Sequence, residues 1–410
     1  MYNTVTLSNG LRVIHRQCDS PIIYCGYQIA AGARDEALGS EGLAHFCEHM
    51  SFKGTRRRNH LQIINCLESV GGELNAYTGK DTTVYHCAIL KEHLPKAVDL
   101  LTDIVFHSTY PEDEIVKEVE VICDEIESYN DSPAELIYDD FENVIFANHP
   151  LGHNILGTQE NVRAFTPADA ARFTGTFYTP ANAVFFCYGD VDFNRLCHLL
   201  EKQDWQLGAQ SDVVAGRKAP VAGLSAPVKQ TITRTMDTHQ AHVMIGARGY
   251  SVHDSRRMSL YLLNNILGGP GMNARLNLSL REKHGLVYTV ESTMVSYSDT
   301  GLWSTYFGCD PKDVDFCLRL VRRELDKLML RPLSETQLRA AKKQIKGQIA
   351  LACDSRENFA LDFGKSFLHY GWEKDIETLY RNIENLTASE LQQTAQDIFD
   401  ENKLTTLIYQ

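Results

Sequence analysis

The residues best suited to chemistry lie within one five-residue stretch near the N-terminus, His45, Glu48 and His49. Residues three or four apart share one face of an α-helix, so both imidazoles can reach one metal ion with the carboxylate beside them. Zinc favours nitrogen and carboxylate ligands, and a catalytic zinc keeps one position open for water. A nearby carboxylate can accept the proton of that water as it attacks a carbonyl. The spacing predicts a hydrolytic zinc site, which needs a third ligand for support.

A third ligand is available from residues 112–129, which have the apolar spacing of a helix. Glu118 and Glu125 lie about two helical turns apart and flank the stripe that this spacing predicts to be buried. Carboxylates directed at a core are costly unless something compensates them, and a metal ion does so. The alternative is a pair of interfacial glutamates that bind Arg or Lys, but the histidine motif favours the metal. The stripe consists of Ile115, Val119, Ile122 and Ile126.

Other candidate residues have simpler structural interpretations. His149 and His153 also lie four apart, but the proline and glycine between them disfavour a helix, and no carboxylate accompanies them. Cys47 lies between the predicted ligands but on the opposite helix face, and it is expected to be a packed thiol. Taken alone, Arg281 could be an ordinary helix arginine.

The composition limits the classes of protein that the chain can be. Its 410 residues are enough for two domains. A formal net charge of -13 argues against a nucleic-acid partner. No stretch approaches 18 apolar residues and no secretory signal is visible, so we expect no membrane span and a cytoplasmic protein. The 11 cysteines lack paired spacing and indicate free thiols in a reducing compartment.

The elements that must position these residues follow from the hydrophobic periodicity. In the first half, extended segments are expected within 4–32 and around 75–88, and helices at 41–53, 59–70, 92–107 and 112–129. The second half repeats this order, with a strand at 241–247, a strand pair at 287–308 and helices at 254–267, 311–330 and 334–352.

This repetition predicts an α+β protein made of two similar halves related by internal duplication. Each half would have a mostly antiparallel sheet with helices packed on one face. The stretch 205–228 is rich in Gly, Ala, Ser and Pro, which is typical of a linker. We therefore expect an N-terminal zinc-binding domain at 1–210, a linker at 211–228 and a C-terminal domain at 229–410.

Several of these segments resemble the pitrilysin family of zinc peptidases, and in particular its half-length branch that is similar to mitochondrial processing peptidase. The matching segments occur in the family's order and span both halves of the chain. They are 6–13, 32–36, 42–55, 71–78, the glutamates 118 and 125, and 280–288. The resemblance implies a zinc-dependent endopeptidase that cleaves peptides or unfolded segments inside a closed chamber.

The resemblance also implies roles for the residues near the motif. His45, His49 and Glu125 would bind one zinc ion per chain, and Glu48 would be the general base that later protonates the leaving amine. Glu118 would stand behind the ligands and orient a histidine.

Further roles concern the substrate. Asn75 and Ala76 match a strand edge that pairs with the substrate backbone. Arg281 and Tyr288 match a pair in the second half that contacts substrate and stabilises the oxyanion.

Full-length members of the family join two such halves in one chain, so a half-length chain would have to dimerise to enclose a chamber. We expect a homodimer in which Arg281 and Tyr288 of one subunit serve the zinc site of the other. The glycine-rich segment 267–273 resembles a loop of the processing peptidase's inactive partner, and its presence beside a complete zinc motif favours a self-sufficient chain. The alternative is a non-catalytic or partner subunit of the same fold.

Overall fold

The structure is a computed structural model that describes residues 2–205, 224, 228–371 and 375–410. Most of the predicted linker, 211–228, lies outside the described residues. The chain forms two compact units. Unit 1 comprises residues 1–127, 153–217 and 352–374, and unit 2 comprises residues 128–152, 218–351 and 375–410.

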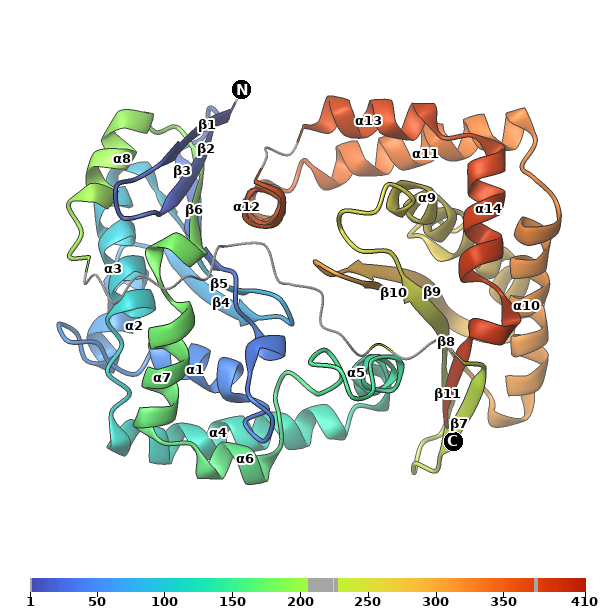
Figure 1. The fold of residues 1–410 in the computed structure, drawn as a ribbon, viewed down its shortest axis with the longest axis horizontal. Helices are drawn as coiled ribbons and strands as arrows, with labels where there is room; N and C mark the ends of the chain where they lie inside the picture. Colours follow the sequence, from blue (N-terminus) through green and yellow to red (C-terminus); the bar gives the residue numbers. More distant parts are fainter. Residues whose placement is uncertain (1, 206–223, 225–227, 372–374) are drawn as a thin grey trace. The chain divides into compact units, whose positions relative to one another are not determined.

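Unit 1 is built on a six-stranded sheet with the order β1-β2-β6-β3-β5-β4 (Figure 1). Neighbouring strands run antiparallel except β2 and β6, which are parallel. The strands are β1 (Tyr2–Thr6), β2 (Arg12–Gln17), β3 (Ile22–Ile29), β4 (Glu73–Thr78), β5 (Thr83–Leu90) and β6 (Ala183–Gly189).

Unit 2 is built on a five-stranded sheet with the order β7-β11-β8-β10-β9. Here β7 and β11 are the parallel pair, and the remaining neighbours are antiparallel. The strands are β7 (Gln230–Arg234), β8 (Ala241–Gly249), β9 (Val287–Ser296), β10 (Gly301–Cys309) and β11 (Thr405–Tyr409).

The two sheets have the same topology once β1, which has no counterpart among the described residues of unit 2, is set aside. Strands β2, β3, β4, β5 and β6 take the same places in the first sheet as β7, β8, β9, β10 and β11 take in the second. In both sheets the single parallel pair joins the first and the last of these five strands. The predicted α+β class with two similar, mostly antiparallel halves is confirmed.

One face of the first sheet carries the main helical layer of unit 1. Tyr27 of β3 is fully buried there and packs edge-on against Phe106 and Phe185 at 5.1 and 4.9 Å between ring centroids. The unit's helices, apart from one, are α1 (Leu43–Ser51), α2 (His60–Glu68), α3 (Leu94–Phe106), α4 (Glu112–Asn130, to residue 127), α6 (Gln159–Ala164), α7 (Pro167–Phe177) and α8 (Phe193–Glu201).

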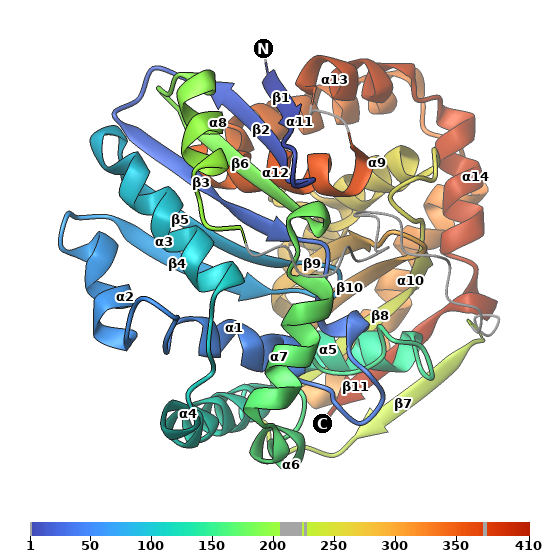
Figure 2. The same ribbon diagram turned by 60° about the vertical axis from the view of Figure 1, so that its left-hand side comes forward.

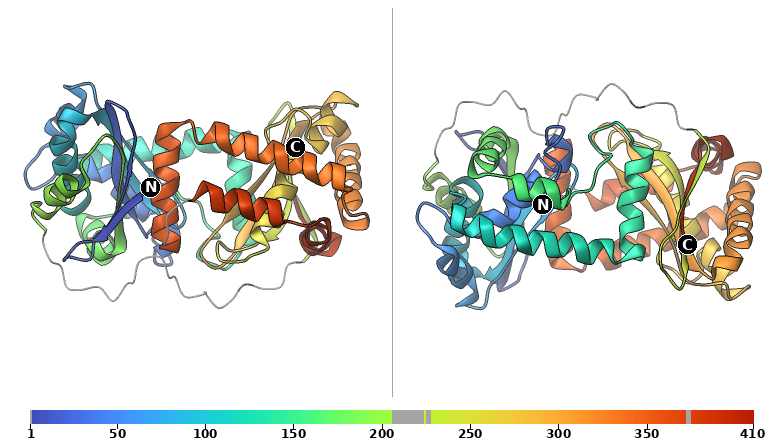
Figure 3. Two further views of the ribbon diagram at one scale, coloured as in Figure 1. Left: turned by 90° about the horizontal axis from the view of Figure 1, so that it is seen from above. Right: turned by 90° about the horizontal axis from the view of Figure 1, so that it is seen from below.

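The remaining helix of unit 1, α12 (Arg356–Tyr370), packs on the opposite face of the same sheet. Figure 3 (left) shows this sheet edge-on, with the orange-red α12 on one side and the blue helices on the other. Phe363 of α12 is fully buried and its ring lies 6.4 Å from that of Phe186. The side chain of Gln28 donates a hydrogen bond to the Leu361 carbonyl at 2.8 Å. This face is therefore covered by a helix from the far end of the chain.

Unit 2 repeats this arrangement with α5 (Pro133–Ile145) in the place of α12. Tyr138 of α5 packs on Tyr306 at 5.4 Å, while Trp303 on the other sheet face packs on Phe399 at 4.5 Å. The remaining helices are α9 (Arg257–Gly268), α10 (Val314–Leu330), α11 (Glu335–Ala352, to residue 351), α13 (Ile376–Asn385) and α14 (Ala388–Ile398).

Each half of the sequence thus gives one helix to the sheet of the other half. The predicted boundaries, 1–210 and 229–410, follow the repeat along the chain, whereas the compact units exchange 128–152 and 352–374. Periodicity marks a helix as amphipathic but does not say which sheet it covers. Among the described residues no helix is long and apolar enough to cross a bilayer. The 11 cysteines are all free, as predicted.

Truncating Phe363 tests the packing of α12. The substitution Phe363→Ala should lower the free energy of unfolding by about 3–5 kcal/mol, because the ring is fully buried between the helix and the sheet. Chemical denaturation followed by fluorescence measures the change. The matched control Leu351→Ala, at a side chain that is 77% exposed, should shift it by no more than about 0.5 kcal/mol. Equal effects of both substitutions would contradict the placement of α12.

Candidate metal centre

Helix α1 is held in place at its N-terminus by the buried carboxylate of Glu36. This carboxylate accepts hydrogen bonds from the backbone N–H groups of Gly42 at 3.0 Å and Ala44 at 2.7 Å. These groups would otherwise lack partners at a helix start. His153 lies 2.9 Å from the same carboxylate, which agrees with its interpretation as a structural residue. Gly42 itself has a φ of +99°, a conformation that favours glycine.

Three side chains from α1 and α4 meet at one point in unit 1. The Nε2 atoms of His45 and His49 lie 3.8 and 3.4 Å from one carboxylate oxygen of Glu125. The candidate ligand atoms of the three residues all lie within 4.8 Å of one another. Ligands around a tetrahedral zinc lie about 3.3 Å apart, so the donor set fits zinc in both chemistry and spacing. Their role as zinc ligands stays a prediction.

Glu118 lies behind His49 and fixes the orientation of its ring. One oxygen of Glu118 lies 2.8 Å from Nδ1 of His49, and the other pairs with the ammonium of Lys53. With Nδ1–H directed at this carboxylate, Nε2 is left to face Glu125. Lys53 in turn keeps Glu118 ionised, since burial opposes the charge but His49 and Lys53 together hold the pKa of Glu118 below its usual value.

The two histidines differ in their affinity for protons. Burial, followed by the nearby charge of His49, lowers the pKa of His45 to about 4. Burial also opposes a charge on His49, but its hydrogen bonds to Glu118 and Glu125 outweigh that effect and raise its pKa to about 9. At neutral pH the metal-free site therefore holds one proton on His49. A metal ion would bind in competition with that proton.

Glu48 is buried beside the cluster and is held by a residue of β4. Thr78 donates a hydrogen bond from its hydroxyl to Glu48 at 2.5 Å. Burial raises the pKa of Glu48, and the Thr78 hydrogen bond partly opposes this effect. A carboxylate with a raised pKa is a stronger base, and its orientation here is fixed by one hydroxyl.

The predicted burial of α4 is only partly correct. The apolar stripe is buried as predicted, with every member at most 8% exposed. The side chain of Glu118 is 7% exposed, but that of Glu125 is 46% exposed. The prediction that both carboxylates are buried, and therefore need a compensating partner, is correct for Glu118 and wrong for Glu125. Glu125 reaches the histidines from the solvent-facing flank of the helix.

Asn75 and Ala76 lie on β4, the edge strand of the six-stranded sheet. The outward backbone N–H of Ala76 bonds to the side-chain oxygen of Asn75 at 2.9 Å. Strand β4 also packs against α1, so this edge runs beside the metal-ligand helix. The location agrees with a strand that could pair with a peptide.

Arg281 and Tyr288 lie in unit 2 and contact each other. The guanidinium of Arg281, from a short helical segment at Asn277–Glu282, lies 5.4 Å from the ring centroid of Tyr288 on β9. Tyr288 is 81% exposed, which is unusual for a tyrosine. An exposed aromatic ring with a cation over it is available to a ligand.

Sequence reasoning missed three residues of this site: Glu36, Lys53 and Thr78. All three lie inside the segments that carry the family resemblance. Thr78 could have been found from strand alternation, since it shares a strand face with Ala76. Glu36 and Lys53 act through contacts with residues that the periodicity alone does not place nearby.

Proton release tests the electrostatics of the cluster. Zinc binding at pH 8 should release about one proton per chain from His49, because His49, with its pKa raised to about 9, is protonated before the metal arrives. Deprotonation of the zinc-bound water, with a pKa of about 7, adds to this release. Titration calorimetry in buffers with different protonation enthalpies measures this number. Because a zinc-bound water is already deprotonated above pH 8, the release should fall by about one proton between pH 8 and pH 10, and a constant value across this range would contradict the assignment of the proton to His49. Glu118→Gln, which removes one cause of the raised pKa, should reduce the release at pH 8.

Two family models match the chain. One is described as "Insulinase (Peptidase family M16)" and matches residues 12–159, and the other is described as "Peptidase M16 inactive domain" and matches residues 164–345. Together they cover more than half of the sequence, so the chain belongs to peptidase family M16. The resemblance to pitrilysin-type zinc peptidases is confirmed.

Relatives of similar length support this assignment. The chain is 33% identical over 398 residues to an uncharacterized zinc protease of Streptomyces coelicolor, covering 96% of this chain and 86% of the relative. It is 30% identical over 413 residues to the uncharacterized zinc protease YmxG of Bacillus subtilis, covering 100% and 98%.

Solved structures show the same fold. A protease from Helicobacter pylori superimposes with a TM-score of 0.91 at 23% identity, covering 100% of this chain and 99% of the other. A Pseudomonas fluorescens structure described as a peptidase M16 inactive domain gives a TM-score of 0.89 at 19% identity, covering 100% and 97%.

Proposed function

We propose that the protein is a zinc-dependent endopeptidase. This proposal rests on the candidate ligand atoms of His45, His49 and Glu125, which lie within 4.8 Å of one another. The buried carboxylate of Glu48 lies on α1, the helix that also carries the two histidines. A hydrolytic zinc site requires three protein ligands and an adjacent general base. The relatives named as zinc proteases support the same metal and reaction.

Several residues of unit 1 would have separate roles in peptide hydrolysis. Bound zinc would supply a Lewis acid and an acidified water. Glu48 accepts the proton of the attacking water and delivers it to the leaving amine. The hydroxyl of Thr78 holds the Glu48 carboxylate, and Glu118 with Lys53 holds the ring of His49.

Strand β4 would bind the substrate as an added strand. Its backbone forms the free edge of the sheet, and pairing through main-chain groups gives binding that tolerates many sequences. The Asn75 side chain occupies the Ala76 N–H, so an incoming peptide has to displace that amide. Substrates are therefore extended peptides or unfolded segments.

Two substitutions separate the base from the metal ligands. Glu48→Gln should keep zinc and lower kcat by about 10²–10⁴-fold, since it removes the proton acceptor. His45→Ala should lose the metal as well as activity. Peptidase assays with metal analysis of both variants measure these effects. Equal activity of Glu48→Gln and wild type would refute the base assignment, and absence of peptidase activity in the zinc-loaded wild type would favour a non-catalytic subunit.

We further propose a homodimer in which Arg281 and Tyr288 act on the zinc site of the other subunit. In the part of this half-length chain that the structure describes, there is one candidate metal cluster, in unit 1, and the Arg281–Tyr288 pair lies in unit 2. The exposed tyrosine ring and its stacked guanidinium are available to contact substrate and stabilise an oxyanion. In this arrangement a single subunit has an incomplete site.

Mixed dimers test whether the pair acts between subunits. Glu48→Gln and the double variant Arg281→Ala/Tyr288→Phe should each be inactive as homodimers. Co-expression should restore about a quarter of wild-type activity, because about half of the dimers are mixed and each contains one complete site. Activity assays on tagged, co-purified dimers measure the recovery. No recovery in mixed dimers of demonstrated composition would contradict action between subunits.

A further inference from the structure

A cavity of about 640 Å³ opens beside α10 in unit 2. Its floor includes Thr231, Thr406 and Ile245, which are register neighbours across strands β7, β11 and β8. Leu318 and Leu404 add apolar surface. The volume lies in the range of small-molecule sites. No part of the candidate metal centre lines it.

The internal repeat explains why this part of the sheet is uncovered. In unit 1 the corresponding strands β2 and β6 lie beside α8 (Figure 2). The ring of Phe193 on α8 stacks on that of His15 on β2, with 5.9 Å between the ring centroids. Leu196 and Leu200 of α8 are fully buried there. Among the described residues, α10 is the only α-helix that lines the cavity of unit 2. The repeat therefore leaves an open face at a position that is packed in the other unit.

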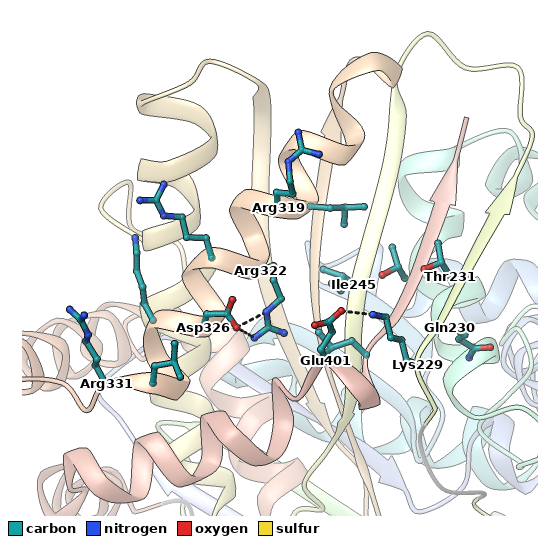
Figure 4. A pocket seen from close by; sticks show the side chains of 15 residues that line it. Lys229, Gln230, Thr231, Ile245, Arg319, Arg322, Asp326, Arg331 and Glu401 are labelled. Atoms are coloured by element: carbon teal, nitrogen blue, oxygen red, sulfur yellow. Dashed lines mark hydrogen bonds and ion pairs between the residues drawn. The ribbon is translucent and has the colours of Figure 1, made fainter.

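The cavity is strongly basic although the chain as a whole is acidic. Two of the cations that line it are neutralised within it, since Arg322 pairs with Asp326 at 2.7 Å and Lys229 pairs with Glu401 (Figure 4). A formal net charge of -13 for the chain makes this concentration of positive charge unexpected. Among the described residues that line the cavity, two are acidic and six are basic: Lys229, Arg319, Arg322, Arg323, Lys327 and Arg331.

Three of the arginines lack an acidic partner. Arg319, Arg323 and Arg331 have no carboxylate within ion-pair distance in the part of the chain that the structure describes. Arg319 lies over the ring of Phe316 at 5.6 Å. Lys327, between them in sequence, pairs with Glu324 at 2.6 Å. The guanidinium groups of Arg319, Arg323 and Arg331 are therefore available to bind an anion.

The spacing of the cations defines the charge of the ligand. Of these cations, Arg319 and Arg323 both lie on α10 without an acidic partner, four residues apart and therefore about 6 Å apart along the helix axis. Lys327 is already paired with Glu324, and Arg331 follows the last residue of the helix. Like charges at this spacing destabilise a helix. A single carboxylate would neutralise only one of them, whereas a chain of phosphates brings three or four negative charges within reach. Guanidinium groups bind phosphate through paired hydrogen bonds.

We propose that this cavity binds a compact polyphosphate, either attached to an organic group as in a nucleoside triphosphate or inorganic. The guanidinium groups of Arg319 and Arg323 hold the phosphates at the rim. The hydroxyl of Thr231 offers a hydrogen bond, and Ile245, Leu318 and Leu404 offer apolar surface to an organic group. The site is independent of the proposed peptidase reaction.

Titration calorimetry on the purified full chain, with inorganic triphosphate and with ATP as separate probes, tests the site. We expect one saturable site per chain. Tighter binding of ATP would assign the apolar floor to an organic group, and equal binding would assign the site to phosphate alone. The double variant Arg319→Gln/Arg323→Gln should weaken binding by at least about tenfold. The control Arg339→Gln, an exposed arginine on α11 outside the cavity, should bind as wild type does.

Three outcomes would overturn the proposal. They are no saturable binding of either probe, equal loss of binding in the double variant and the Arg339→Gln control, and competition by a hexaglutamate peptide as effective as that by triphosphate. The last outcome would mean that the surface binds acidic protein segments instead. Circular dichroism of each variant verifies that the substituted chains remain folded.

Discussion

The hydrogen bond between Glu118 and His49 is the interaction on which the candidate centre depends. It joins α1 to α4, and these two helices supply every candidate ligand. If α4 rotated by one residue, about 100°, neither of its glutamates would face α1. The buried apolar stripe of α4 prevents such a rotation, because its members are at most 8% exposed. Core packing therefore sets the rotation of α4 that lets both glutamates face α1, and the hydrogen bond from His49 to Glu118 then fixes the orientation of the ligand ring.

Local patterns in the sequence predicted much of this architecture. The positions of α1 and α4, the stripe on α4 and the repeated order of elements all follow from hydrophobic spacing. The motif at His45 to His49 indicated the chemistry. The family resemblance then distinguished Glu125 from Glu118, which spacing alone left open. Both glutamates were expected to face the core, and the exposure of Glu125 shows that flank positions on a helix differ in burial.

Contacts between distant segments could not be predicted in the same way. The exchange of α5 and α12 between the two sheets depends on which apolar helix face packs on which sheet. Both helices are amphipathic, and periodicity does not show which of the two sheets each helix covers. The same holds for Lys53, whose role is visible only once Glu118 lies beside it. Thr78 is an intermediate case. Strand alternation predicts which face of β4 carries its side chain, but it does not predict that Glu48 lies next to this face. Sequence thus predicts elements better than their partners.

The exchange of α12 has a consequence for biosynthesis. All strands of the unit 1 sheet have been synthesised once β6 is made, but the helix that covers one face of this sheet, α12, is formed by residues 356–370. While the ribosome adds the intervening residues, at roughly 5–20 per second, that apolar face lacks its native cover. The nascent chain therefore exposes apolar surface on this face of the sheet during that interval. Completion of the first core is delayed until translation is nearly finished, so a truncated chain that contains every candidate metal ligand would still have an unfinished core.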